Sequence, residues 1–193
     1  MADRRQTCNE PEHMISFLNV TRHAALVVVL TIANVARANP ENFTVHSVTG
    51  TNSFTLAAAK GKFVALHFLL KTECPYCIRH THEYAQKAAP NQNVIHVFLK
   101  PDTEAEIKAW AIKLGDDVLK LPIYRDPDAR LAKAFNIPDG YKFHGQTVHF
   151  PALVLLDPTG KEVFRYVGKS NTDRLSYERF AAKLEELTQP SRR

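Results

Sequence analysis

The sequence predicts an α/β fold whose central mixed β-sheet is flanked by helices on both faces. Two observations indicate this class. Apolar, strand-like runs alternate with helix-like segments through the middle of the chain, and a hairpin of two strands follows near its end. Alternation favours parallel strands joined by crossover helices, whereas a hairpin adds antiparallel strands to the same sheet.

The first predicted elements are short strands, a buried strand and a helix. Residues 41–56 contain the short strands, with a turn at Gly50. Residues 62–70 (KFVALHFLL) are almost continuously apolar, which is typical of a central strand covered on both faces. Residues 75–89 have helical spacing, and Pro90 ends that helix.

A second buried strand, a capped helix and a short strand come next. Residues 94–99 are apolar and predict the strand. Thr103 and Glu106 have the spacing of a capping box, which predicts a helix that runs to about Leu114. Residues 121–124 are predicted to form a short strand.

The last part of the chain is predicted to hold two helices, a loop and the hairpin. The dipeptide Asp126-Pro127 opens the first helix. Residues 137–148 contain proline and glycines and predict a loop. Residues 152–156 and 162–167 form the hairpin strands, and residues 174–187 carry the apolar stripe of a terminal helix.

The N-terminus is predicted to be a leader. Residues 24–36 are apolar and uncharged, follow Arg22 and end at an A-x-A site, so residues 1–38 are expected to be a cleaved signal peptide. The protein would then be secreted or periplasmic, as a domain of residues 39–193. The apolar run is shorter than the roughly 20 residues of a membrane span, so no stable span is expected after cleavage; an uncleaved anchor is the alternative. Translation from Met14 would make the region before the apolar run net positive.

Charge and cysteine content narrow the function classes. The net charge of +5 is spread along the chain without a Lys/Arg block, so no nucleic-acid partner is expected. Cleavage removes Cys8 and leaves only Cys74 and Cys77. A secreted scaffold held by disulfides would use several distant pairs, and a single close pair closes too small a loop to be mainly structural.

The motif C-P-Y-C follows a buried strand and opens a predicted helix. The N-terminus of a helix carries unpaired N–H groups and partial positive charge, which favour a thiolate over a thiol. A thiolate attacks disulfides, and a second sulfur one turn away resolves the mixed disulfide that results. Cys74 and Cys77 therefore predict thiol-disulfide exchange.

Together with this motif, the segments LPIYRDPDARLAKAFNI and FPALVLLDPTGKEVFRYVG resemble the extracytoplasmic thioredoxin-like group, the TlpA-like redoxins that are related to AhpC/TSA proteins. The resemblance covers roughly residues 43–188. It implies a thioredoxin fold and a thiol-disulfide oxidoreductase in which Cys74 attacks and Cys77 resolves. Such an enzyme needs no cofactor besides its redox-active disulfide Cys74–Cys77, and its partners are protein disulfides or dithiols and a further redox protein.

The resemblance also implies substrate-binding residues on two segments. Pro75 and Tyr76 lie between the cysteines, and Phe150 precedes Pro151, which stands at the position of the family's cis-proline. This proline sits against the cysteine pair in the family and leaves a backbone edge for a substrate polypeptide.

A peroxiredoxin-type thiol peroxidase is a less favoured alternative. The peroxiredoxin signature P-x-x-x-T-x-x-C would need threonine and proline where Lys71 and His67 stand. The arginine expected just before the late strand is also missing. These groups bind peroxide beside the thiolate, so their absence weighs against peroxidase chemistry.

Copper binding is the other alternative, because the chain is rich in histidine. Two thiolates and an imidazole are soft ligands for Cu(I) or Zn(II), and Cys74, Cys77 and His149 are the candidate set. Covalent haem is excluded, because C-x-x-C-H would need histidine where Ile78 stands.

Further polar residues near the cysteines have two interpretations each. Glu73 and His67 are candidates for proton transfer to or from the dithiol. Alternatively, Glu73 is a solvated loop acid and His67 a satisfied core histidine. His80 and His82 are expected on the exposed side of the helix, and His144 in a surface loop.

Overall fold

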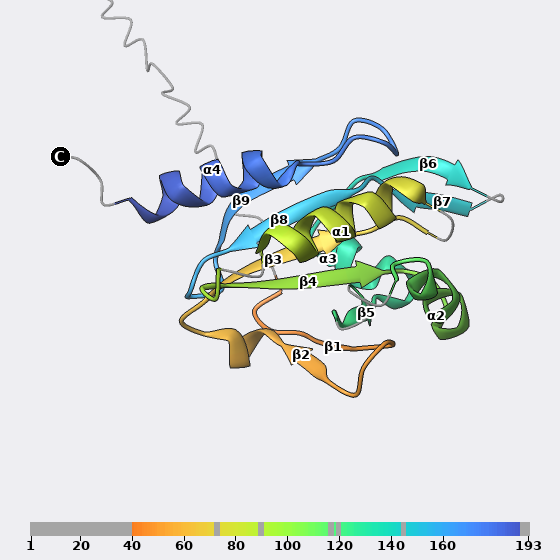
Figure 1. Cartoon of the computed structure of the whole chain (residues 1–193), viewed down its shortest axis with the longest axis horizontal. Coiled ribbons are helices and arrows are strands. Elements are labelled where there is room, and N and C mark those ends of the chain that lie inside the picture. The colour runs from red at the N-terminus through yellow and green to blue at the C-terminus, as the bar shows by residue number, and fades with distance from the viewer. Residues whose placement is uncertain are drawn as a thin grey trace, which may run out of the picture. The chain divides into compact units, whose positions relative to one another are not determined.

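A five-stranded sheet organises the fold (Figure 1). The structure, a computed structural model, describes residues 40–71, 74–88, 91–115, 118, 121–143 and 146–189. The sheet has the order β5-β4-β3-β8-β9, with β3 (Phe63–Phe68), β4 (Val94–Lys100), β5 (Ile123–Arg125), β8 (Ala152–Leu156) and β9 (Glu162–Val167). β3, β4 and β5 are parallel, whereas β8 and β9 are antiparallel to their neighbours. The predicted mixed sheet is confirmed.

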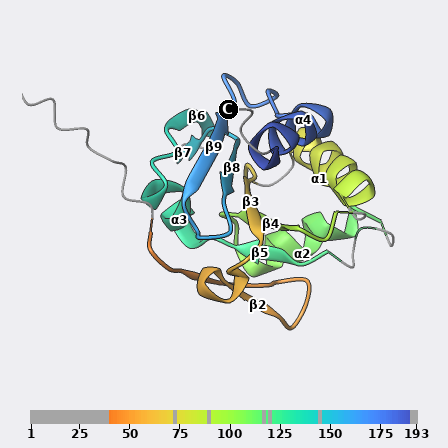
Figure 2. The same cartoon turned by 90° about the vertical axis from the view of Figure 1, so that its left-hand side faces the viewer.

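Side chains of β3 alternate between two apolar clusters, one on each face of the sheet. Ala65 belongs to the cluster shared with α1 (Pro75–Ala88) and α4 (Tyr177–Thr188). Val64 and Leu66 belong to the other cluster, with α3 (Arg130–Ala134) and the small ribbon of β1 (Thr44–His46) and β2 (Ser53–Thr55). Figure 2 shows α1 and α4 side by side, away from β1 and β2. Burial on both faces explains the continuous apolar run.

Helix α1 buries a polar stripe against the sheet. Its buried residues are Cys77, His80, Thr81, Tyr84 and Ala88, which follow the spacing of one helix face. The prediction that His80 lies on the exposed side is wrong, since only 6% of it is exposed. This stripe places the second cysteine of the motif in the core of the protein.

Helix α2 (Glu104–Ile112) begins as its sequence predicts. The Thr103 hydroxyl accepts from the Glu106 backbone N–H, and the Glu106 carboxylate accepts from the Thr103 backbone N–H. This confirmed capping box satisfies N–H groups that the helix itself leaves unpaired. The remaining short elements are η1 (Leu56–Ala59) and η2 (Pro127–Ala129).

The segment predicted as a loop over residues 137–148 is instead a hairpin. β6 (Asp139–Phe143) and β7 (Gln146–His149) pair antiparallel as a separate two-stranded sheet. Its sequence lacks apolar alternation because a two-stranded ribbon is held by backbone hydrogen bonds and by packing on a neighbour. His144 lies outside the described residues.

The terminal helix begins later than predicted. Ser176 is its N-cap and accepts from the Arg179 backbone N–H, so α4 starts at Tyr177 rather than at residue 174. Serine is a preferred N-cap because its hydroxyl satisfies a free backbone N–H. Arg174 therefore lies in the loop between β9 and α4.

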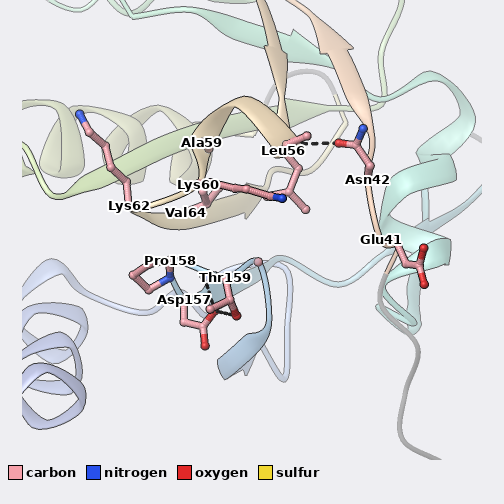
Figure 3. Close-up of a pocket in the computed structure, with 12 residues that line it drawn as sticks. Glu41, Asn42, Leu56, Ala59, Lys60, Lys62, Val64, Asp157, Pro158 and Thr159 are labelled. Carbon is pink, nitrogen blue, oxygen red and sulfur yellow. Dashed lines mark hydrogen bonds between the residues drawn. The ribbon is translucent and has the colours of Figure 1, made fainter.

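A pocket of about 270 Å³ lies between η1 and the turn that joins β8 to β9 (Figure 3). Lys60, Lys62 and Asp157 are among the residues that line it. The register of β3 against β8 pairs Val64 with Leu156, so this pocket lies at the end of β3 opposite the cysteines.

Within the described part of the chain, no helix combines the length and the apolar character that crossing a bilayer requires. The predicted leader, residues 1–38, lies outside the described residues, and so do Met14 and Cys8.

Gly168 offers a test of how the loop after β9 is held. A Cβ atom there would lie 2.4 Å from the Asp173 carbonyl oxygen and 2.9 Å from Pro151 Cγ. We expect Gly168→Ala to lower the free energy of unfolding by about 1–3 kcal/mol, because the backbone must shift. Urea denaturation measures the change.

The matched control is Gly50→Ala, where the nearest atom to a Cβ is Ser47 Oγ at 3.4 Å. This variant should stay within about 0.5 kcal/mol of the unaltered protein. Equal stability of the two variants would contradict the packing described for Gly168.

Candidate active site

Cys74 lies directly before α1 on the segment that follows β3, and Cys77 lies in the first turn of α1. Both are free thiols, and the Cys77 backbone N–H donates to Cys74 Sγ at 3.2 Å. The Cys74 carbonyl accepts from the backbone N–H groups of Cys77 and Ile78, so the helix starts at this point. The Cys77 backbone N–H acts to lower the pKa of Cys74, as expected at a helix N-terminus, although other contacts of the sulfur outweigh it.

Burial distinguishes the two sulfurs. Cys74 is 9% exposed, whereas Cys77 is completely buried. Cys77 Sγ also accepts from the Leu70 backbone N–H at 3.4 Å. A substrate disulfide therefore meets Cys74 first, and Cys77 is held behind it.

An arginine that the sequence analysis did not single out contacts both sulfurs. Arg174 Nη2 lies 3.3 Å from Cys74 Sγ and 3.3 Å from Cys77 Sγ. Arg174 Nη1 donates to the carbonyls of Asn171 and Asp173, which fixes the guanidinium in its loop. The positions of Arg174 and the cysteines are 97 and 100 residues apart, so no local motif could have identified it.

This arginine corrects one argument against peroxidase chemistry. The segment just before β8, where the peroxiredoxin arginine is expected, contains no arginine. The site nevertheless has a guanidinium beside its thiols, supplied by Arg174 from a different segment. The dithiol therefore has a neighbouring cation even though the motif position holds no arginine.

A buried lysine adds a second positive charge behind Cys77. Lys100, at the end of β4, is completely buried and donates through Nζ to the Leu70 carbonyl at 2.7 Å. Its ammonium forms an ion pair with Asp102 at 3.2 Å and lies 4.5 Å from the centre of the Trp110 ring. A buried cation needs such partners because leaving water costs several kcal/mol.

These contacts decide how the dithiol ionises. Burial acts to raise the pKa of Cys77, but the hydrogen bond with Cys74 and the charges of Arg174 and Lys100 outweigh it and lower the pKa to about 6. The hydrogen bond with Cys77, together with burial, raises the pKa of Cys74 well above its ordinary value. The pair loses one proton readily and holds the second, so the sulfurs share one negative charge at neutral pH.

Two predicted substrate-binding residues follow Cys74 directly in the chain, and a third shares a cavity with Arg174. Pro75 and Tyr76 are exposed beside Cys74, and the Arg79 guanidinium lies 4.6 Å from the centre of the Tyr76 ring. Pro151 is buried and lines a small cavity together with Arg174.

The β6–β7 hairpin also approaches the site. Tyr141 of β6 packs on the same cluster as the cysteines, and burial and the negative charge of the cysteines raise its pKa. The ring of Phe150, next to β7, packs so closely on Gly140 that a Cβ there would lie 2.7 Å from it. The hairpin missed by the sequence analysis is therefore one wall of the dithiol site.

The candidate copper ligand His149 is buried, and its Nδ1 lies 2.7 Å from the Phe150 carbonyl oxygen. Its pKa is lowered by burial. It lines a pocket of about 410 Å³ with Lys71 and Arg125, whose lining does not include the cysteines. Among the described residues, no three His, Cys, Asp or Glu side chains are grouped so that they could hold a metal ion.

The two candidates for proton transfer have different outcomes. Glu73 lies outside the described residues. His67 is completely buried, and its two ring nitrogens lie 2.9 Å from His80 Nε2 and 2.9 Å from His96 Nδ1. His67 is thus a core histidine whose hydrogen-bonding partners are two other imidazoles.

Solved structures with this fold include a protein studied for alkyl peroxide reduction and a disulfide oxidoreductase. The bacterioferritin comigratory protein of Xanthomonas campestris, studied for alkyl peroxide reduction, has a TM-score of 0.63 and 17% identity over 79% of this chain and 96% of its own. AhpC of Enterococcus faecalis has a TM-score of 0.64 and 18% identity over 77% of this chain and 89% of its own. A secreted Mycobacterium tuberculosis disulfide oxidoreductase homologous to E. coli DsbE has a TM-score of 0.54 and 21% identity over 75% of this chain and 95% of its own.

These likenesses confirm the thioredoxin-like α/β fold. No curated protein sequence matches the chain significantly. The model of the AhpC/TSA family matches residues 36–163, which is more than half of the chain. The protein therefore belongs to the AhpC/TSA family of redoxins, as an oxidoreductase of the peroxidase or thiol-disulfide type with a Cys74–Cys77 pair.

Proposed function

We propose that this redoxin is a thiol-disulfide oxidoreductase that reduces or exchanges disulfides in other proteins. The observation that carries the proposal is the contact of Arg174 Nη2 with both sulfurs at 3.3 Å. One cation that serves both cysteines can stabilise negative charge on whichever sulfur carries it as exchange proceeds. A resolving thiol held one turn from the attacking one suits intramolecular exchange.

The exchange proceeds in two steps. In the first, Cys74 thiolate attacks one sulfur of a substrate disulfide, the substrate S–S bond breaks, and one substrate thiolate leaves. In the second, Cys77 loses its proton and attacks Cys74 Sγ in the mixed disulfide. The second substrate thiolate then leaves, and the Cys74–Cys77 disulfide forms; the two electrons that the cysteines lose reduce the substrate.

Exposure assigns these roles. Cys74 is the sulfur with exposed surface, and Cys77 has none. Attack at Cys74 leaves the mixed disulfide next to Cys77, whose thiolate is stabilised by Arg174 and Lys100. The second step is therefore intramolecular, and the two cations stabilise the Cys77 thiolate that forms when its proton leaves.

A polypeptide substrate fits the surroundings of Cys74. Tyr76, two residues after Cys74, is an aromatic residue that is 36% exposed. An aromatic ring on an exposed turn provides contact area for a bound peptide at little entropic cost. A redox partner that resets the Cys74–Cys77 disulfide would dock on the same surface, because both must reach Cys74.

The same proposal includes export from the cytoplasm. The apolar run of residues 24–36 and the A-x-A site that follows support a cleaved leader over residues 1–38. Mass spectrometry of protein secreted by its host should find an N-terminus at Asn39. An intact N-terminus in the exported fraction would favour a retained anchor.

Peroxide reduction is the second candidate function, and one observation favours it. Arg174 places a guanidinium beside the thiolate, where it could also polarise a bound peroxide. Turnover of insulin disulfides and of hydrogen peroxide by the same protein, measured with the same electron donor, separates the two candidates. Disulfide exchange predicts the faster rate with insulin.

The cysteine roles are tested by single serine variants. Cys74→Ser should abolish insulin-disulfide reduction, because a serine hydroxyl cannot form the mixed disulfide. Cys77→Ser should instead accumulate a mixed disulfide with the substrate, visible by non-reducing electrophoresis, since the resolving sulfur is gone. Insulin reduction by Cys74→Ser at the rate of the unaltered protein would overturn the proposed function.

The charge of Arg174 is tested by its effect on pH dependence. The guanidinium lowers the pKa of Cys77, which lies at about 6, so Arg174→Met should raise it. A rise of roughly one to two units, usual for the loss of a close opposite charge, would reduce the thiolate fraction at neutral pH up to about tenfold. Alkylation by iodoacetamide, followed against pH, should therefore slow at neutral pH and recover at higher pH.

The control for this experiment is Arg130→Met. The Arg130 side chain is 78% exposed and pairs with Asp128 at 3.9 Å, away from the cysteines. It should leave the alkylation profile unchanged. Identical profiles for the Arg174 and Arg130 variants would show that Arg174 does not control the dithiol.

A further inference from the structure

Three imidazoles form a continuous hydrogen-bonded chain from α1 across β3 to β4. His80 Nε2 lies 2.9 Å from His67 Nδ1, and His67 Nε2 lies 2.9 Å from His96 Nδ1. His67 and His80 are buried, whereas His96 is half-buried and forms the outer end of the chain. His67 turns its two nitrogens toward different partners, so the three rings do not point at one common metal position.

The inner end of the chain lies beside the dithiol. His80 follows Cys77 by three residues on α1, and both belong to its buried face. Residues with this spacing are neighbours on a helix surface. The positive charge of Arg174 acts on His80 and on both cysteines.

A small cavity lies beside His80 at this end of the chain. His80 and Arg174 both line it, and its volume of about 10 Å³ is close to the space of one water molecule. His80 Nδ1 and Arg174 Nε are buried and have no hydrogen-bond partner among the described residues. The unpartnered Nδ1 gives the inner end of the chain a nitrogen that can accept a proton.

The three rings are neutral at physiological pH. Burial lowers the pKa of His67 well below its ordinary value and the pKa of His96 to about 4. Burial and the charge of Arg174 lower the pKa of His80 to about 3. Each neutral imidazole carries one N–H. The chain can therefore be arranged in two ways: every N–H donates toward His96, which we call the outward polarity, or every N–H donates toward His80, the inward polarity.

We propose that the His80–His67–His96 chain is a proton relay that takes the proton of Cys77 to the outer edge of the protein during resolution of the mixed disulfide. The inference rests on the proposed function, because it assigns residues to its second step. In the outward polarity His80 Nδ1 accepts, His80 Nε2–H donates to His67, and His67 Nε2–H donates to His96.

Each proton moves by one position when Cys77 reacts. The proton of Cys77 Sγ passes to His80 Nδ1, its neighbour on the buried face of α1, and one proton crosses each imidazole contact outward. His96 Nε2 releases a proton to solvent, and the chain is left in the inward polarity. No imidazolium persists, which matters because the site is buried and already holds two cations.

The reverse half of the catalytic cycle resets the chain. When a redox partner reduces the Cys74–Cys77 disulfide, Cys77 leaves as a thiolate. Cys77 then takes a proton from His80 Nδ1–H, and His96 Nε2 takes one from solvent. Protons and electrons balance over the two halves, so the relay needs no additional reactant.

The test follows the two steps separately in stopped-flow mixing of the reduced protein with one equivalent of dithio-bis(nitrobenzoate). Attack by Cys74 releases the first coloured thiolate, and attack by Cys77 releases the second. His67→Phe and His96→Gln interrupt the relay, because neither side chain can exchange a proton between two nitrogens. We expect the second phase to slow about tenfold or more, the lower range of general acid–base effects, while the first phase is unchanged.

The pH profile separates a relay from a structural role. The second phase of the unaltered protein should change little near neutral pH, whereas that of the variants should rise with pH as solvent becomes the acceptor. His96→Gln carries the test if the buried His67→Phe variant does not fold. His82→Gln is the control, because His82 lies on the same helix and is not part of the chain.

The possible failures are distinguishable. Absence of the first phase in the unaltered protein would overturn the proposed function itself. Two phases in every protein, with a second phase in His67→Phe and His96→Gln equal to that of His82→Gln at all pH values, would overturn the relay alone.

Discussion

The guanidinium of Arg174, which lies 3.3 Å from each of two sulfurs, is the contact on which the chemistry of this protein depends. An isolated thiolate at a fully buried position is unfavourable, because leaving water costs several kcal/mol. Arginine remains charged under all relevant conditions and can donate to two acceptors at once. Arg174 and Lys100 together stabilise a buried thiolate in the reduced protein. Both cations stabilise this anion and neither stabilises the neutral disulfide, so they favour the reduced state.

The fold serves to hold this contact. The segment after β3 carries the cysteines, and the loop after β9 brings Arg174 to the same place, so that residues about a hundred positions apart meet. The Gly168 backbone N–H donates to the Pro151 carbonyl at 2.8 Å, and the lack of a side chain at Gly168 lets the Asp173 carbonyl approach. Because Ser176 is the N-cap of α4, Arg174 stays in the loop before the helix. These local features fix the guanidinium without any motif around it.

The central sheet and the capping box of α2 could be predicted from the sequence, because apolar runs and cap spacing are local signals. The β6–β7 hairpin could not, because its pairing depends on the backbone and on a neighbouring surface. Arg174 looked like the start of a helix, and its role depends on a long-range contact. The burial of His80 had a signal in the sequence, since His80 shares the helical face of Cys77 and Tyr84, but its polar side chain favours the prediction that it is exposed.

The most direct test of this account is a titration of the reduced, unaltered protein by thiolate absorbance in the ultraviolet. Because the two sulfurs share one charge, we expect one equivalent of thiolate to appear with a pKa of about 6, and the second to stay protonated far into the alkaline range. Two equivalents appearing together near the ordinary cysteine pKa of about 8.5 would contradict the account.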